Sequence, residues 1–449
     1  MSGKISNKVL LAALALACAA FSAHGQTYTG NAPYSIFGVG DIVQPGTAFN
    51  RSMGGVGTAM RNNHYINQLN PAAVTARDSL SFLADFSING DNRYFKQSGA
   101  STVSNTFNIG SLAISFPIWK TSAMMVGVVP YSGVGFDFSY NYSDPGIIGR
   151  TNSITYSASG IGGLNQAFAA AGVTFFKRLS LGAQFNYTFG SMEKLYGCTF
   201  SDKSFSSVEN GYRMFLTGTS GKFGLQYSQP VGEKGTVIVG ATYSMKTDLK
   251  GFIEGYNFSS GAQIDTLYHK IDTLGKTANA NLASEFSVGI SYRHSDVWMA
   301  EFDYSRSDWT GSNLDKVNGF RTNSKPVSVG GQPYSSFSTT VSEAYRFGFE
   351  YIPNKNDIRY YMRKVAYRAG AYYKKEHYLL DGNVVSAAGV TLGATFPVKL
   401  VSGLTNGLTV AVDFGRRGSL TGNMIRENFI NFSIGINIFD IWFQKPTYN

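Results

Sequence analysis

Residues 427–440 read ENFINFSIGINIFD. Every second residue is large and apolar: Ile430, Phe432, Ile434, Ile436 and Ile438. The residues between them are small or polar: Asn431, Ser433, Gly435 and Asn437. A period of two is typical of a β-strand with one apolar and one polar face. The end of the chain is therefore predicted to be such a strand.

The same alternation recurs through the chain after residue 78. We predict strands at about 79–89, 106–117, 122–142, 150–176, 179–193, 209–228, 236–253, 277–293, 297–310, 339–353, 364–379, 385–397, 406–416 and 427–440. This makes fourteen, and single-chain bacterial barrels need an even number. The strands predict an all-β, antiparallel transmembrane β-barrel.

The connections alternate between short turns and longer loops. Short turns belong on the periplasmic side of an outer-membrane barrel, and long loops belong outside. Trp119, Trp298 and Trp442 then fall at periplasmic strand ends, where an aromatic girdle is expected. The long loop at 254–276 contains two Ile-Asp-Thr-Leu repeats and is predicted to form a hairpin above the membrane, or else a loop on which a partner docks.

The composition supports a membrane barrel. The chain holds 51 Gly, 27 Tyr and 33 Phe, and only 15% of its residues are charged, which fits neither a soluble helical enzyme nor a disordered chain. After the first 25 residues, no apolar run reaches the length of a membrane-spanning helix. We expect an integral protein of the bacterial outer membrane.

The first 25 residues are predicted to be an export signal. Lys4 and Lys8 precede an apolar run at 9–21, and small residues precede Gln26. Cys18 offers the alternative of a lipid-modified cysteine. The net charge of +10 allows contact with outer-membrane lipid headgroups or lipopolysaccharide, or is a habit of composition. An exported chain without a basic run is not expected to bind nucleic acid.

Residues 26–78 show no strand alternation. They are rich in Gly and Asn and still carry large apolar side chains that must pack against something. We therefore divide the chain into a signal peptide (1–25), a hatch that fills the lumen (26–78) and the barrel with a short periplasmic tail (79–449).

Two neighbouring strands contain interruptions. One strand holds Pro130 and then Gly133 and Gly135, and a proline inside a barrel strand loses a ladder hydrogen bond. The next strand holds a glycine group: Gly160, Gly162 and Gly163. These defects are either simple bends or, together, a side opening in the wall.

No motif indicates catalysis or a cofactor. The five histidines lie outside any metal-ligand spacing, and no nucleophile elbow, P-loop or EF-hand loop is present. The alternation instead points six charged residues into the lumen: Glu301, Asp303, Arg346, Glu350, Arg368 and Asp413. They are expected to brace the wall and anchor the hatch through Arg51 and Arg61, or to line a path for polar solutes.

The hatch segment resembles that of the FadL/OmpP1 family of outer-membrane transport proteins. The residues that carry the resemblance are the glycine-rich run at 53–59 (MGGVGTA), Asn67, and Asn70-Pro71-Ala72. The opening at Pro33-Tyr34-Ser35, followed by Phe37-Gly38, is similar to the Bacteroidota branch. The resemblance implies a plugged barrel through which hydrophobic compounds such as long-chain fatty acids pass, leaving sideways at the third strand.

The residues predicted to face the lumen are polar or small, whereas a pocket for a fatty acid needs an apolar lining. A hydrophobic path would then be formed by the hatch itself: Ile36, Phe37, Ile42, Val43, Phe49, Met53, Met60, Leu69, Asn70 and Pro71. The leading hypothesis is a passive channel for a hydrophobic small-molecule ligand. The alternatives are an accessory barrel subunit of an outer-membrane assembly or secretion complex, with envelope protein partners, and a closed barrel that acts at the cell surface.

Overall fold

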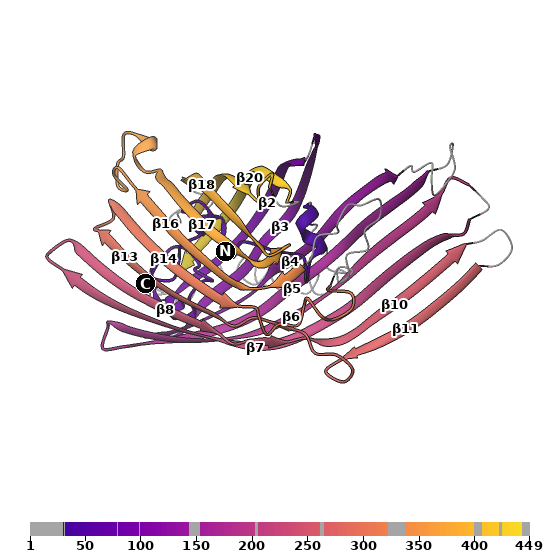
Figure 1. Cartoon of the computed structure of the whole chain (residues 1–449). Helices are drawn as coiled ribbons and strands as arrows, with labels where there is room; N and C mark the ends of the chain where they lie inside the picture. The colour runs from indigo at the N-terminus through magenta and orange to yellow at the C-terminus, as the bar shows by residue number, and fades with distance from the viewer. Residues whose placement is uncertain are drawn as a thin grey trace, which may run out of the picture.

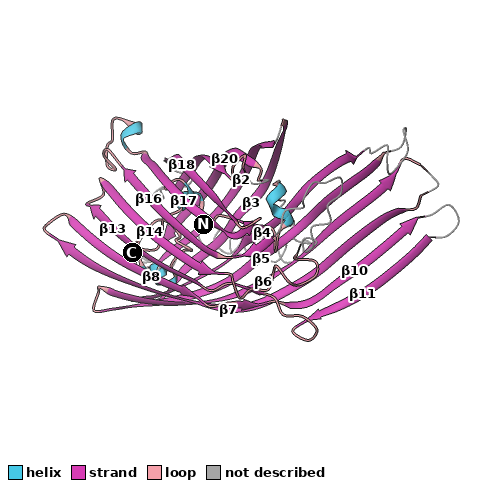
Figure 2. Ribbon diagram, viewed as in Figure 1, coloured by secondary structure: helices cyan, strands magenta, loops and turns pink. Residues whose placement is uncertain are grey.

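A computed structural model describes residues 30–441 except 31, 79, 98, 143–152, 203–204, 261–264, 322–336, 399–405 and 422–423. The predicted signal peptide and Trp442 lie outside the described residues. Within them, the chain is a single ring of antiparallel strands (Figures 1 and 2). None of the helices found there is long and apolar enough to cross a bilayer.

Fourteen strands form the ring, as the alternation predicts. The bounds are β2 (Ser81–Gln97), β3 (Ala100–Trp119), β4 (Ser122–Tyr142), β5 (Ile154–Phe175), β6 (Leu179–Phe200), β7 (Ser207–Val231), β8 (Gly235–Ser244) continued by β10 (Lys250–Ser260), β11 (Asp265–Leu274) with β13 (Glu285–His294), β14 (Trp298–Asp308), β15 (Phe337–Thr339) with β16 (Val341–Tyr351), β17 (Ala366–Leu380), β18 (Asn383–Val398), β19 (Asn406–Arg417) and β20 (Arg426–Ile441). The ring closes because β20 pairs with β2.

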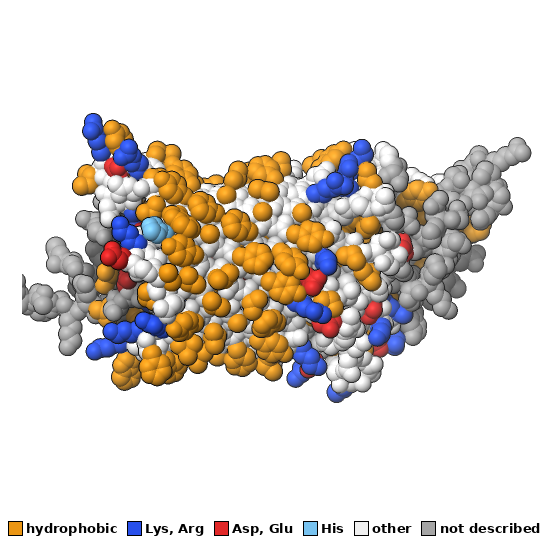
Figure 3. Space-filling view, turned by 60° about the vertical axis from the view of Figure 1, so that its left-hand side comes forward, with side chains coloured by type: hydrophobic (Ala, Val, Ile, Leu, Met, Phe, Trp, Pro, Cys, Tyr) orange, Lys and Arg blue, Asp and Glu red, His pale blue; other side chains and the backbone are white. Residues whose placement is uncertain are grey.

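The outer surface carries the apolar half of each alternation. On β20 the exposed residues are Ile430, Phe432, Ile434, Ile436 and Ile438, whereas Ser433 and Asn437 are buried inside. Hydrophobic side chains form a broad belt across the face seen in Figure 3, and many of the charged ones gather toward its two ends. A belt of this kind is the lipid-facing surface of an outer-membrane barrel, so the predicted integral location is confirmed.

The seventh strand of the ring is interrupted, and its two parts, β8 and β10, pair with different neighbours. β8 stays with β13, whereas β10 continues along β7 and forms a hairpin with β11. The hairpin predicted for residues 254–276 is therefore present. The break between β8 and β10 is bridged by a small pair of strands, β9 (Thr247–Asp248) and β12 (Asn281–Leu282).

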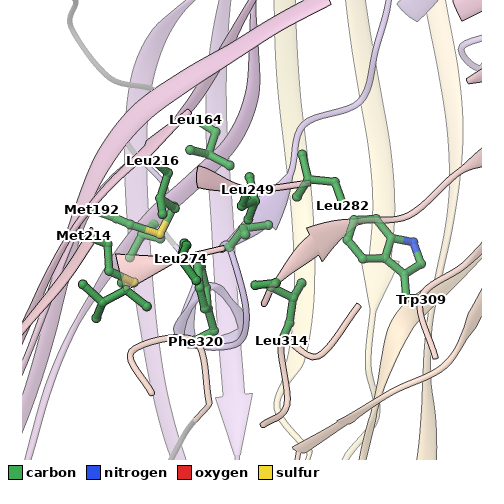
Figure 4. Close-up of a cluster of buried hydrophobic side chains, with 14 of the residues drawn as sticks. Leu164, Met192, Met214, Leu216, Leu249, Leu274, Leu282, Trp309, Leu314 and Phe320 are labelled. Carbon is green, nitrogen blue, oxygen red and sulfur yellow. The ribbon is translucent and has the colours of Figure 1, made fainter. Parts of the chain in front are cut away.

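An apolar cluster packs this hairpin against the segment after β14. Leu249, Leu274 and Leu282 meet Trp309, Leu314 and Phe320, while the wall contributes side chains of β5, β6 and β7 (Figure 4). Its labelled wall members are Leu164, Met192, Met214 and Leu216. The extracellular half is thus stabilised by a conventional core, unlike the polar lumen below it.

The N-terminal segment, residues 30–78, lies in the lumen. It contains η1 (Pro33–Ile36), β1 (Asp41–Ile42), the one-turn helix α2 (Ala48–Arg51) and η2 (Pro71–Thr75). Its residues contact the inner faces of strands from β4 to β19, so it crosses the barrel from side to side.

Candidate functional site

The seam between β3 and β4 is paired over well under half its length. Pairing runs from Trp119 opposite Ser122 to Leu112 opposite Val128 and stops there. Each strand carries a bulge just above, at Gly110 in β3 and at Tyr131 in β4. Bulges bend a strand and raise its twist, and β3 and β4 diverge above this point (Figure 1). β3 and β4 are therefore not paired beside Pro130, and we call this unpaired stretch of the seam the gap.

The position of this gap corrects one sequence-based expectation. β4 and β5 stay paired from Ser122 to Tyr142 except at the Tyr131 bulge, and Gly133 and Gly162 lie within this paired stretch. Gly160, Gly162 and Gly163 therefore belong to a closed seam. They admit close neighbours instead: a Cβ on Gly162, whose φ is +112°, would lie 2.3 Å from the Ser191 carbonyl oxygen.

The hatch takes the place that β3 leaves. β1 pairs with β4, with Asp41 opposite Gly133 and Ile42 opposite Ser132. The Val43 N–H donates to the Tyr131 carbonyl at 3.0 Å. Gly40 has a φ of +90°, and a Cβ there would lie 2.4 Å from the Gly133 carbonyl oxygen, so the approach requires glycine.

A buried group of four charges fixes β1 from the other side. The two terminal nitrogens of Arg417 on β19 donate to the Asp41 carboxylate at 2.8 and 2.9 Å, and its Nε donates to Glu427 at 2.8 Å. Arg93 on β2 lies 3.2 Å from Asp41. Burial opposes ionisation of Asp41, but Arg417 and Arg93 hold the pKa of its carboxyl below the ordinary value. Asp41 thus ties β4 to β2 and β19 across the gap.

The glycine-rich run at 53–59 lies against the opposite wall. Asp303 accepts the N–H groups of Gly57 and Thr58 at 2.8 and 2.9 Å, and Glu301 accepts that of Ala59 at 2.8 Å. The predicted anchoring carboxylates therefore bind hatch backbone. Gly370 on β17 touches this run so closely that a Cβ would lie 2.2 Å from the Gly54 nitrogen.

The other charged residues predicted to face the lumen bind partners in the wall, and one of them also contacts the hatch. Arg368 pairs with Glu350 at 2.8 Å and lies 4.1 Å from the Phe49 ring centroid. Asp413 accepts from Tyr372 at 3.0 Å, and Arg346 donates to Ser305 at 2.8 Å. Pairing is thus local within the wall.

The two hatch arginines are held by neutral acceptors. Arg51 donates to the Gln44 carbonyl at 2.6 Å. Arg61 donates to Ser180, Gln226 and Thr75. Within the described part of the chain, neither arginine forms an ion pair. The ion pair between hatch and wall is made instead by Asp41, which the sequence did not single out.

The predicted apolar hatch residues mostly pack against protein. Phe49, Met53 and Met60 form one cluster with Met299 on β14, and Phe37 joins another with Tyr378. Ile36 packs against the extracellular cluster. The Asn70 amide caps η2 and donates to the Thr58 carbonyl, and Pro71 lies against Gly182 and Gly224. These residues position the hatch.

A cavity of about 350 Å³ remains beside the hatch and reaches the gap. Ile42 and Val43 of the hatch and Val129 and Pro130 of β4 give it apolar lining beside the gap, and Leu69 is a further apolar lining residue. The rest of its lining carries six basic and six acidic side chains: Arg51, Arg93, Lys222, Arg346, Lys374, Arg417, Asp41, Asp91, Glu285, Asp303, Glu376 and Asp413. The cavity thus has apolar side chains beside the gap, and its lining as a whole mixes apolar with charged side chains.

Sequence reasoning missed one further contact. Lys194 on β6 is fully buried, and its ammonium donates to the carbonyls of Ile36 and Gly38 at 2.7 and 3.0 Å. Its inward position follows from strand alternation, but its partner lies more than 150 residues away. No group of three or more metal-ligating side chains is found among the described residues.

Comparison with known proteins gives one matching family and several solved structures that share one fold. The family model described as BamG matches residues 5–449. No curated protein gives a significant sequence match. Among solved structures, the CymD monoaromatic hydrocarbon channel is 16% identical over 91% of this chain and all of its own, with a TM-score of 0.57.

Two further structures share the fold. The Pseudomonas putida toluene transporter TodX is 14% identical over 90% of this chain and 99% of its own, with a TM-score of 0.58. A Pseudomonas aeruginosa FadL homologue is 13% identical over 90% of this chain and all of its own, with a TM-score of 0.61. At this identity the likeness establishes a FadL-like barrel, as the hatch motifs predict.

Proposed function

Since the chain belongs to the BamG family and its barrel is FadL-like, we propose that it is a passive path for small hydrophobic molecules across the outer membrane. The observation that carries this proposal is the cavity that reaches the wall between β3 and β4. A ligand would leave sideways past Pro130, from the apolar lining beside the gap into the lipid belt. The similar structures described as hydrocarbon channels and a toluene transporter support this direction.

The proposed path requires β1 to move. β1 occupies the gap with only two strand residues, so its displacement would break few backbone hydrogen bonds. No chemical step is proposed, and the charged residues serve to hold the hatch.

The test locks β1 to the wall. Ile42 and Ser132 lie directly opposite each other, so cysteines at both positions are spaced for a disulfide. In a Cys198→Ser background, the doubly substituted barrel is reconstituted in liposomes, and entry of labelled toluene and of a labelled fatty acid is measured. We expect entry when reduced and at least about a tenfold loss when oxidised, because the proposed route is then closed.

A second candidate function is an accessory barrel of an envelope protein complex. It is favoured by the balanced charge of the cavity and by the burial of Phe49, Met53 and Met60 in packing contacts. Equal, background-level entry in both redox states, together with stoichiometric co-purification of one envelope protein, would contradict the transport proposal and support this second function.

A further inference from the structure

The loop between β16 and β17 differs from the other described connections at its end of the barrel. The turns after β3, β5, β7 and β13 are two or three residues long, whereas this loop spans residues 352–365 and includes η3 (Tyr361–Arg363). Figure 2 shows its short cyan turn standing clear of the strand ends. A few residues suffice to join antiparallel strands, so the extra length serves another purpose.

The loop presents large apolar side chains to solvent. Ile358 is 98% exposed and Met362 is 57% exposed, and about half of the Tyr360 and Tyr361 surfaces are accessible. These residues follow Tyr351 and precede Tyr367, the exposed tyrosines at the ends of β16 and β17. Contiguous exposed apolar side chains at such a site mark an interaction surface.

The loop is also held in one shape. The Asp357 carboxylate accepts the N–H groups of Arg359 and Tyr360 at 2.8 and 2.7 Å and pairs with Arg363 at 3.3 Å. The guanidinium carbons of Arg359 and Arg363 lie 5.3 and 4.9 Å from the Tyr360 ring centroid. This network turns Ile358 outward and fixes the aromatic ring beside two cations.

A neighbouring strand steadies the base of the loop. The Tyr361 hydroxyl donates to the carbonyl of Pro397 on β18 at 3.0 Å, and the Asn354 N–H donates to the Arg363 carbonyl at 2.8 Å. A surface ordered before binding loses less entropy when a partner docks. A lipid anchor needs no fixed shape, so this order favours a folded protein as the occupant.

The charge of the loop indicates the kind of partner. Residues 352–365 contain four basic side chains, Lys355, Arg359, Arg363 and Lys364, and one acidic side chain, Asp357, which gives a net charge of +3. Lys355 also pairs with Asp296 of the β13–β14 turn. Tyrosine and arginine are enriched in binding hot spots. We propose that the β16–β17 loop is the docking surface for a periplasmic protein with an acidic rim around an apolar pocket, and that Ile358 enters this pocket. The proposal is independent of whether the barrel conducts.

The first experiment places a photo-crosslinking phenylalanine derivative at Ile358 in living cells. The matched control carries the same derivative at Glu233, which is exposed in the β7–β8 turn. We expect one discrete protein adduct from position 358 and none from position 233. Adducts with lipid alone, or equal protein adducts at both positions, would overturn the proposal.

The second experiment tests the charge. Arg359→Glu combined with Lys364→Glu is expected to lower the yield of the adduct at least about tenfold, because like charges would then meet. Lys120→Glu combined with Lys234→Glu makes the same change of charge in two other turns at this end of the barrel and is expected to change the yield less than about twofold. Resistance of the folded barrel to denaturing gel buffer at room temperature confirms that each variant folds.

The third experiment uses the crosslinked protein, purified, with the detergent-solubilised barrel. Its affinity is expected to fall at least about tenfold with Ile358→Asp, since the apolar anchor is lost. It should also fall with rising salt, because the contact is charged. An affinity unchanged by Ile358→Asp, or by salt, would refute the proposed surface.

Discussion

The hatch meets the barrel wall in two different ways. At 53–59 its backbone lies directly on β14 and β17, where wall glycines admit it and two carboxylates accept three N–H groups. At β1, two residues add to the edge of β4, and Asp41 makes the remaining contacts through its charge. The first contact is specified by shape over a closed wall; the second depends on one buried ion group beside a gap. Movement is therefore expected to begin at β1.

The largest effect is expected from Arg417→Met. The change leaves Asp41 and Glu427 buried near each other, with Arg93 as their remaining ion-pair partner among the described residues. Removing one partner of a buried ion pair costs about 3–5 kcal/mol, and urea unfolding in micelles should show a loss of that size. Arg416→Met is the matched control, since Arg416 is exposed on the same strand. Equal losses in both variants would show that the ion group does not hold β1.

Gly370→Ala should come next and acts on the other contact. The new methyl group would lie 2.2 Å from the Gly54 nitrogen, so the hatch must shift away from β17. Overpacking of this kind costs about 1–3 kcal/mol. Faster amide hydrogen exchange at 54–59, with β17 itself still protected, would report the shift. Gly311→Ala, where nothing lies within 4 Å, should leave exchange unchanged. Normal protection at 54–59 in Gly370→Ala would contradict the tight contact.

Asp303→Asn tests the same contact and is expected to cause a smaller loss of stability. The amide keeps the size of the carboxylate but accepts two N–H groups less strongly, and hydrogen bonds to a charged acceptor are worth about 1.5–3 kcal/mol. We expect a loss of about 1–2 kcal/mol by urea unfolding. Asp248→Asn, which changes an exposed carboxylate, is the control. A loss no larger than in the control would show that the Asp303 charge is dispensable.

The barrel could be predicted from sequence because its signal is local. Alternation within each strand gave the number of strands, and the inward position of Glu301 and Asp303 follows from the same period. Pro130 pointed to a defect in the correct strand. The sequence did not show at which edge of β4 the pairing stops. The two bulges beside the seam, at Gly110 against β2 and at Tyr131 against β5, depend on pairing between strands.

The candidate site was harder to predict because its contacts join distant residues. Asp41 and Arg417 are 376 positions apart, and no spacing links them. By sequence, Gly370 and Gly348 are ordinary small residues that face the lumen. In the structure, the backbone of the hatch lies directly against them. Conversely, Phe49 and Met53 were predicted to line a hydrophobic path, but in the structure they are buried in an apolar cluster. Type and alternation predict burial, but they do not distinguish a side chain that lines a cavity from one that fills it.

A global effect as small as that of Asp303→Asn is expected from Asp41→Asn, and this variant separates the two contacts most sharply. Arg417 keeps Glu427, so stability should fall by only about 1–2 kcal/mol. Locally, amide exchange at 41–43 should rise while exchange at 54–59 stays unchanged, because the two contacts share no residue. Because the pKa of Asp41 lies below its ordinary value, its contribution is present above about pH 4 and is lost only as pH falls further. Wild-type exchange at 41–43 should therefore keep the same protection factors at about pH 7 and pH 5. If Asp41→Asn also loosens 54–59, the hatch moves as one body and the gap cannot open by release of β1 alone.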